Sequence, residues 1–275
     1  MASPIPQLKD GEQTVYFQAG GEWCFLRTPE SYKASGGAIP CIIQCHGHHG
    51  YVKNGEADWL TEDFKLAFVN SLIDTGIAVA STHATGNHWG RPNAVAANGA
   101  LFDALLEGSN VDRERMGLWG GGLGGALLWN SVTGPLLGHL RAVVLQQATI
   151  SYESVIRNHK FKALLLEAYG LPADTPDDLA VAALSFNDPV NRTRLLVEQK
   201  GRALASALPE VLFIHGDEDE NMLYQENPVR LSHLLSPLGA RFSFHTFKGV
   251  GHATYQLGDT AAKVLTDYFG KVFAL

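Results

Sequence analysis

The stretch GLWGGGLGGALLWN, residues 117–130, decides how the rest of the chain is interpreted. A short apolar run leads into a cluster of glycines, and apolar residues with helical spacing follow. This order predicts a strand, a sharp turn and a helix. Enzymes that hold a nucleophile on such a turn have the pattern Gly-x-Ser-x-Gly. Here the small residues are Gly120 and Gly124, but the residue between them is Gly122. The turn is therefore predicted without its reactive hydroxyl group.

On both sides of this turn, predicted strands alternate with predicted helices. We expect strands at 13–18, 22–27, 40–45, 77–83, 115–120, 142–148, 210–216 and 241–247. We expect helices at 60–76, 92–108, 124–132, 228–239 and 260–270. The first two strands read as a hairpin, and the later alternation is typical of parallel strands joined by helices. The pattern predicts an α/β fold with a mostly parallel sheet of about eight strands and helices on both faces.

The alternation stops between about Ser151 and Pro209. That stretch is polar, charged and helix-like, and it contains no clear strand. An interruption of about sixty residues is too long for an ordinary connection inside one domain. We therefore expect residues 1–150 and 210–275 to form the core, with residues 151–209 inserted as a helical cap.

Composition excludes several classes of protein. The chain has 275 residues, of which 45% are hydrophobic, enough for one large domain with a buried core. Its formal net charge is −7, without a basic block, so nucleic acid is not an expected partner. The N-terminus lacks the pattern of a signal peptide, and no apolar stretch is long enough to span a membrane. The oligomeric state stays open.

The cysteines favour a reducing environment. Cys24, Cys41 and Cys45 are odd in number and form no CxxC pair, so a disulfide framework is not expected. A cytoplasmic protein that acts on a small molecule fits these observations. Cys45 precedes the HGHHG segment, but a thiol on a buried strand behaves as a small hydrophobic group. We do not expect it to replace the missing nucleophile.

Chemically capable residues follow the ends of four predicted strands. Besides the glycine turn, the segments are HGHHG at 46–50, HGDEDEN at 215–221 and GVGHATY at 249–255. In open α/β sheets, functional groups lie in the loops at the carboxyl ends of the strands. We expect these four segments to meet in one site.

Together the four segments resemble the α/β-hydrolase family. An HG-x-x-G oxyanion loop, a Gly-x-nucleophile-x-Gly-Gly elbow, an HGDxD acid loop and a late Gly-x-Gly-His occur in the order of that family. The resemblance places the nucleophile position at Gly122, the acid at Asp219 and the histidine at His252. Asp217 is the reserve choice for the acid. In this chemistry the carboxylate fixes the histidine, which acts as a general base.

The resemblance also implies an oxyanion hole formed by backbone N–H groups of His48 and Leu123. The side chains of His46, His48 and His49 raise the alternative of a metal site. Metal sites usually draw ligands from several spaced positions with carboxylate support, so the tight loop fits the oxyanion role better. We expect no metal. As substrate contacts we select Trp89 and Tyr51, which follow two strand ends.

The glycine cluster also fits the dinucleotide pattern GxGxxG through Gly120, Gly122 and Gly125. That pattern normally follows the first strand of its unit, with an acid on the next strand. Here the turn lies in the middle of the chain, and the next strand, AVVLQQA, ends without an acid. We therefore expect no nucleotide cofactor.

Three accounts of Gly122 remain open. In the first, the chain is a hydrolase whose covalent serine chemistry is disabled; a carboxylic ester is the family default, with an amide or lactone possible. In the second, His252 and Asp219 act without a covalent intermediate, as in a water-attack hydrolase, a lyase or a cyclase. In the third, the chain binds a small molecule without turnover. The retained acid, histidine and oxyanion loop favour a hydrolase-type site.

Overall fold

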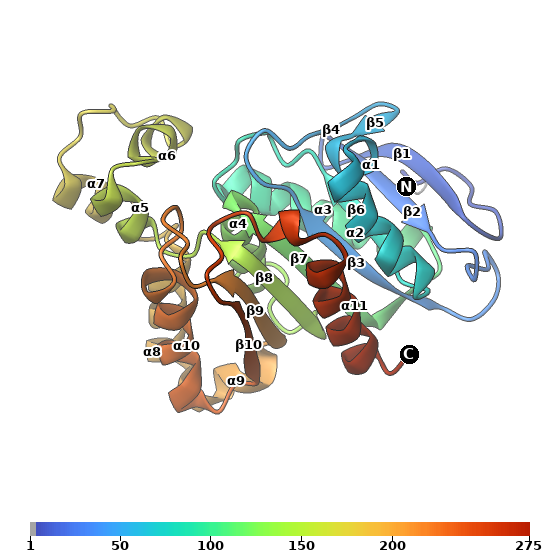
Figure 1. Ribbon diagram of the computed structural model, residues 1–275. Coiled ribbons are helices and arrows are strands. Elements are labelled where there is room, and N and C mark those ends of the chain that lie inside the picture. The colour runs from blue at the N-terminus through green and yellow to red at the C-terminus, as the bar shows by residue number, and fades with distance from the viewer. Residues whose placement is uncertain (1–3) are drawn as a thin grey trace.

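An eight-stranded sheet organises the computed structural model, which describes residues 4–275 (Figure 1). The strand order is β1-β2-β6-β3-β7-β8-β9-β10. The strands are β1 Gln13–Ala19, β2 Glu22–Thr28, β3 Ile39–Cys45, β6 Ala78–Thr82, β7 Val111–Gly122, β8 Ala142–Ala148, β9 Glu210–Gly216 and β10 Phe242–Phe247. β2 pairs antiparallel with β1 and β6, and the other neighbours are parallel. The prediction of a mostly parallel α/β sheet is confirmed.

Helices cover both faces of this sheet because the strand side chains alternate between two apolar clusters. Ile43 and Phe213 pack in the cluster of one face, whereas their chain neighbours Ile42 and Ile214 pack in the cluster of the other. The first face is covered by α3 Pro92–Gly108, α4 Leu123–Val132, α8 Pro189–Lys200 and α10 Arg230–Leu235. The second face is covered by α2 Asp63–Asp74 and α11 Asp259–Phe273 (Figure 1). Strands buried on both faces explain the continuous apolar runs of the sequence.

Two predicted helices differ from the structure. The helix expected at 60–76 is divided into α1 Asp58–Thr61 and α2, because the backbone of Glu62 is extended. The helix expected at 228–239 is regular only in α10, with a π turn at Gln225–Val229 and a 3-10 turn at Ser236–Leu238. Pro228 lies inside the π turn, where its missing N–H interrupts the regular ladder. A small hairpin of β4 Val52–Lys53 and β5 Glu56–Ala57 was not predicted.

The segment between β8 and β9 contains helices and, within residues 151–209, no strand. Its helices are α5 Tyr152–Asn158, α6 Lys162–Ala168, α7 Asp177–Leu184, α8 and α9 Leu204–Ala207. α5, α6 and α7 lie at one end of the molecule, and their apolar side chains share a cluster with Trp89, Leu123, Ala126 and Met222, which lie outside residues 151–209 (Figure 1). In contrast, Val190 of α8 and Leu204 of α9 pack in the cluster beneath the sheet. The segment is therefore divided between an outlying part and a part that covers the sheet.

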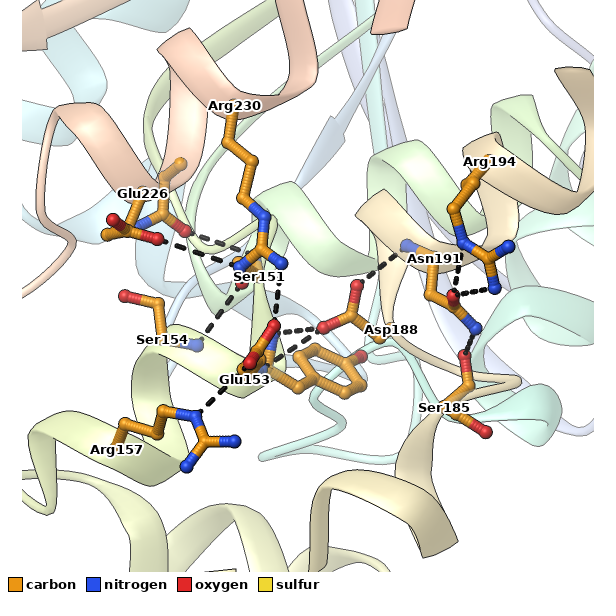
Figure 2. A network of polar contacts seen from close by, with 12 residues as sticks. Ser151, Glu153, Ser154, Arg157, Ser185, Asp188, Asn191, Arg194, Glu226 and Arg230 are labelled. Carbon is orange, nitrogen blue, oxygen red and sulfur yellow. Dashed lines mark hydrogen bonds and ion pairs between the residues drawn. The ribbon is translucent and has the colours of Figure 1, made fainter. Parts of the chain in front are cut away.

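A buried aspartate joins these two parts (Figure 2). Asp188 caps α8 by accepting the N–H of Asn191 at 2.9 Å, and it also accepts the N–H groups of Tyr152 at 2.6 Å and Glu153 at 3.2 Å in α5. Burial raises the pKa of Asp188, and the backbone N–H groups oppose that rise. Arg230 of α10 donates to the Glu153 carboxylate at 2.6 Å. The first turn of α5 is thus fastened to α8 and α10.

Within residues 4–275, no helix combines the length and the apolar character that crossing a membrane requires. Residues 1–3, part of the N-terminal segment for which the sequence predicts no signal peptide, lie outside the described residues.

Candidate active site

The predicted sharp turn joins β7 to α4. Gly122 is the last residue of the strand and the residue before the helix, and its φ of 53° and ψ of −132° lie in a region that favours glycine. Glycine adopts this conformation freely, whereas other residues adopt it at a cost. A side chain at position 122 would be located at the carboxyl end of the central strands.

The glycines of this turn differ in the space around them. A Cβ atom added to Gly124 would overlap the carbonyl oxygen of Cys45. Backbone or side-chain atoms also block a Cβ at three further glycines, namely Gly120, Gly121 and Gly125. At Gly122, apart from the two neighbouring residues of the chain, the only heavy atom of residues 4–275 within 4 Å of an added Cβ is Nε2 of His252, at 4.0 Å. Packing thus requires glycine around position 122, but it leaves that position open toward a histidine.

His252 is held by a carboxylate from a neighbouring strand end. Asp219 follows β9, His252 follows β10, and Asp219 Oδ2 lies 2.8 Å from His252 Nδ1. This contact leaves Nε2 of the ring directed toward Gly122. Asp217, the reserve acid, instead accepts the N–H of Gly249 at 2.7 Å. The structure therefore brings Asp219, and not Asp217, to the histidine.

The Asp219 carboxylate is buried and fully engaged. Its Oδ1 accepts the N–H groups of Asn221 and Met222, each at 2.8 Å, and its Oδ2 lies 3.1 Å from Nε2 of His215. Burial alone would raise the pKa of Asp219, but hydrogen bonds from His215 and His252 hold it well below its usual value. The carboxylate is ionised at neutral pH and can stabilise a positive charge on His252.

A cavity of about 690 Å³ opens over these groups. Of the residues selected from the sequence, Gly122, Leu123, His48, Trp89 and His252 line it. Asp219 lies behind His252 rather than at the cavity surface. Tyr51 is not among the lining residues.

Tyr51 is engaged elsewhere. Its hydroxyl group donates to Glu56 in the small hairpin, and its N–H donates to Asp58 at 3.0 Å. The structure therefore does not bring this selected substrate contact to the cavity.

The cavity is apolar and its charges are paired. Aromatic and aliphatic side chains form its walls: Trp59, Phe64, Trp89, Leu123, Phe161, Leu164, Met222 and Tyr255. Lys65 donates to Asp58 at 2.8 Å and to Glu62 at 2.9 Å. Burial and the nearby His49 lower the pKa of His48, which favours its neutral form. The lining therefore suits an uncharged, largely apolar ligand.

The HGHHG loop lies beside the turn. A Cβ at Gly47 would be 3.4 Å from the carbonyl oxygen of Gly121. The N–H of His48 has no acceptor within residues 4–275, and Leu123 is the first residue of α4, where backbone N–H groups have no intrahelical acceptor. Both groups belong to residues that line the cavity.

His46 of this loop contacts the backbone through both of its ring nitrogens. The ring nitrogens of His46 lie 2.9 Å from the Gly47 carbonyl oxygen and 2.8 Å from that of His83. In residues 4–275, no group of three or more His, Cys, Asp or Glu side chains is placed to hold a metal ion. Burial raises the pKa of the Cys45 thiol to about 12, so this thiol stays protonated at neutral pH.

Sequence reasoning missed a polar group of the cavity wall, Gln147. This residue is the last but one of the apolar strand β8 and has a φ of 39°, and its side chain contacts Thr254, two positions after His252. Non-glycine residues in such a conformation cost about 1–3 kcal/mol and are frequent at functional sites. The available signal was the pair Gln146-Gln147, which is polar at the end of a strand that is otherwise apolar.

Comparisons with known proteins bear on the family and the fold of this chain. Residues 55–274 match the model of the prolyl oligopeptidase family. The structure of puromycin hydrolase superposes with a TM-score of 0.71 at 16% identity, covering 96% of this chain and 40% of that chain. Est1E from Butyrivibrio proteoclasticus superposes with a TM-score of 0.66 at 14% identity, covering 95% of this chain and 99% of that chain. A truncated carbohydrate esterase from gut microbiota superposes with a TM-score of 0.69 at 17% identity, covering 100% of both chains.

A comparison with curated protein sequences finds no match. At these identities the structural likeness shows the fold, and it confirms the α/β-hydrolase fold over nearly the whole chain.

Proposed function

Because the chain belongs to the prolyl oligopeptidase family, we propose that it carries the active site of a hydrolase for carboxylic esters of small molecules, complete except for the nucleophile hydroxyl. Family membership supports hydrolase chemistry. The observation that carries the proposal is the open Cβ position of Gly122, 4.0 Å from His252 Nε2. A serine Oγ, one bond beyond that Cβ, comes within hydrogen-bond reach of the ring.

Each remaining group has a role in ester cleavage. His252 Nε2 accepts the proton of the attacking oxygen, and Asp219 fixes the tautomer and stabilises the imidazolium. The N–H groups of His48 and Leu123 stabilise the negative charge that develops on the carbonyl oxygen. With Gly122 in place, no acyl-enzyme can form at this position, so covalent serine catalysis is disabled. An amide or lactone fits the same arrangement.

We propose that the outlying helices α5, α6 and α7 act as the cap. Phe161 and Leu164, at the start of α6, line the cavity together with Trp89 from the core. This assignment is narrower than residues 151–209, because α8 and α9 cover the sheet. Trp89 and the cap would then contact the substrate.

We also propose a reducing compartment such as the cytoplasm, because Cys24, Cys41 and Cys45 are buried free thiols.

The same open space supports a second candidate function. A water molecule in place of the missing hydroxyl could be activated by His252, oriented by Asp219, to attack a substrate carbonyl directly. In that case the unaltered chain turns over substrate, and His252→Ala abolishes the activity. A chain that only binds a ligand turns over nothing, whether position 122 holds glycine or serine.

The experiment compares the unaltered chain, Gly122→Ser and Gly122→Ala with p-nitrophenyl butyrate. We expect Gly122→Ser to exceed the other two by at least about a thousandfold in kcat/KM, since the triad acts as a unit. Gly122→Ala is the matched control, because it introduces the same backbone strain without a hydroxyl group. Equal rates for all three, with Gly122→Ser folded, would overturn the proposal.

A further inference from the structure

We propose that the side-chain amide of Gln147 sets the substrate class of this site by donating a hydrogen bond to an uncharged acceptor oxygen of the substrate, other than the oxygens of the scissile ester. The preferred substrates are then esters that carry an ether, hydroxyl or additional carbonyl oxygen close to the bond that is cleaved. This inference rests on the proposed function.

Gln147 is placed beside the nucleophile position by an irregularity of the sheet. β8 pairs in register with β7 up to Gln146, opposite Gly121, but the next pair joins Ala148 to Gly122. Gln147 is therefore the extra residue, and its φ of 39° accommodates it. Its side chain is only 2% exposed and lines the cavity.

A chain of buried hydrogen bonds fixes which end of this amide faces the cavity. The indole N–H of Trp119 can only donate, and it donates to Gln146 Oε1 at 2.9 Å. The Gln146 amide nitrogen therefore donates to Thr254 Oγ1, at 2.9 Å. The Thr254 hydroxyl proton is left for Gln147 Oε1. This assignment gives the indole of Trp119, the amide of Gln146 and the hydroxyl group of Thr254 one acceptor each, and it turns the NH₂ group of Gln147 away from Thr254.

The NH₂ group of Gln147 is unpaired and accessible. Its nitrogen has no acceptor within residues 4–275. This nitrogen is not sealed from solvent, and because Gln147 lines the cavity, the nitrogen faces the cavity. A donor in an apolar cavity gains most from a ligand acceptor, because it otherwise forgoes a hydrogen bond. The amide is preorganised for one oxygen atom of a ligand.

Electrostatics indicate that this oxygen is uncharged. In the part of the chain that the structure describes, Lys65 is the only lysine or arginine of the cavity lining, and Asp58 and Glu62 hold it. The lowered pKa of His48 favours its neutral form. A carboxylate or phosphate on the substrate would thus lose its hydration without gaining a free cation. An uncharged oxygen loses less and gains the amide donor.

The test uses two isosteric ester pairs, each differing by one oxygen atom in place of one CH₂ group. Benzyl methoxyacetate is compared with benzyl butyrate, which places the oxygen in the acyl half. 2-Methoxyethyl phenylacetate is compared with butyl phenylacetate, which places it in the alcohol half. Binding to the unaltered chain is measured by calorimetry, and kcat/KM is measured in Gly122→Ser. We expect the oxygen-containing member of at least one pair to be favoured about three- to tenfold in both assays.

Three variants identify the donor. Gln147→Glu keeps an acceptor for Thr254 and removes the donor, while Gln147→Met removes both; each is expected to abolish the preference in binding and to leave in kcat/KM only the higher intrinsic reactivity of the oxygen-containing ester. Gln256→Glu is the matched control, because it adds the same charge to an exposed residue of the same cavity, and it should keep the preference in binding. Absence of a binding preference in both pairs, or a binding preference that survives both Gln147 variants, would overturn the inference. If Gly122→Ser hydrolyses all four esters without a preference, only the inference fails; if it hydrolyses none, the proposed function fails.

Discussion

From the space around each glycine of the turn we predict how substitutions change the free energy of unfolding, independently of any activity. Gly122→Ala places a methyl group in the open cavity, so its cost is the backbone strain at a φ of 53°, about 1–3 kcal/mol. Gly124→Ala drives a methyl group into the carbonyl oxygen of Cys45, where the backbone has to shift. Overpacking in a close-packed core costs typically about 1–3 kcal/mol and occasionally more, and a backbone clash belongs at the upper end. Gly124→Ala should therefore be the more destabilising of the two.

The assay is urea denaturation followed by circular dichroism, with the free energy of unfolding extrapolated to water. Gly270→Ala in α11 is the control, because outside the helix's own backbone an added Cβ there meets no atom of residues 4–275 within 4 Å, and φ is not positive. It should leave the free energy unchanged or raise it by up to about 1 kcal/mol. If Gly122→Ala destabilised the chain as much as Gly124→Ala does, position 122 would not be open, and the reasoning from its geometry would be refuted.

Three further predictions address the cap attachment, the buried thiols and the acid. Asp188→Ala leaves three backbone N–H groups without their acceptor, so it should lower the free energy of unfolding by about 2–4 kcal/mol in the same assay; no loss would show that the carboxylate does not fasten the cap. Burial raises the pKa of Cys24 to about 11 and that of Cys45 to about 12, so both thiols should resist dithionitrobenzoate at pH 8 until the chain unfolds. Rapid labelling of the native chain would contradict the burial. Because unfolded thiols ionise from about pH 9 while the folded ones stay protonated, the free energy of unfolding should fall as pH rises above 9. In the Gly122→Ser background, Asp219→Asn should lower kcat by about 10³–10⁴-fold with little change in KM, and an unchanged kcat would remove Asp219 from the site.

The fold was predictable because the strands of the large sheet and most of the helices that cover it have a strong local pattern. The expected bounds of the strand at 142–148 and the helix at 92–108 agree with those of β8 and α3. The break at Glu62 was not predicted, because the segment LTEDF at residues 60–64 continues the helical spacing and no proline or glycine marks the break there.

The site was predictable only where motifs repeat a known order. The contact between Asp219 and His252 follows from two loops at the ends of neighbouring strands, whereas the catalytic roles that the resemblance implies for these residues stay predictions. Tyr51 was selected for its place after the HGHHG loop, but its hydroxyl group is drawn to Glu56. The chain of hydrogen bonds from Trp119 to Gln147 joins residues more than a hundred positions apart at its Thr254 link, a separation that no local pattern records.

The central claim is that the site lacks one hydroxyl group and is otherwise assembled for covalent catalysis. The most direct measurement is the intact mass of the unaltered chain, Gly122→Ser and Gly122→Ser/His252→Ala after incubation with a fluorophosphonate, with the adduct located by peptide mapping. We expect Gly122→Ser to gain one adduct, at position 122. The unaltered chain should gain none, and the double variant should not react at an appreciable rate. A folded Gly122→Ser variant that gains no adduct, or an adduct of equal yield in the double variant, would contradict it.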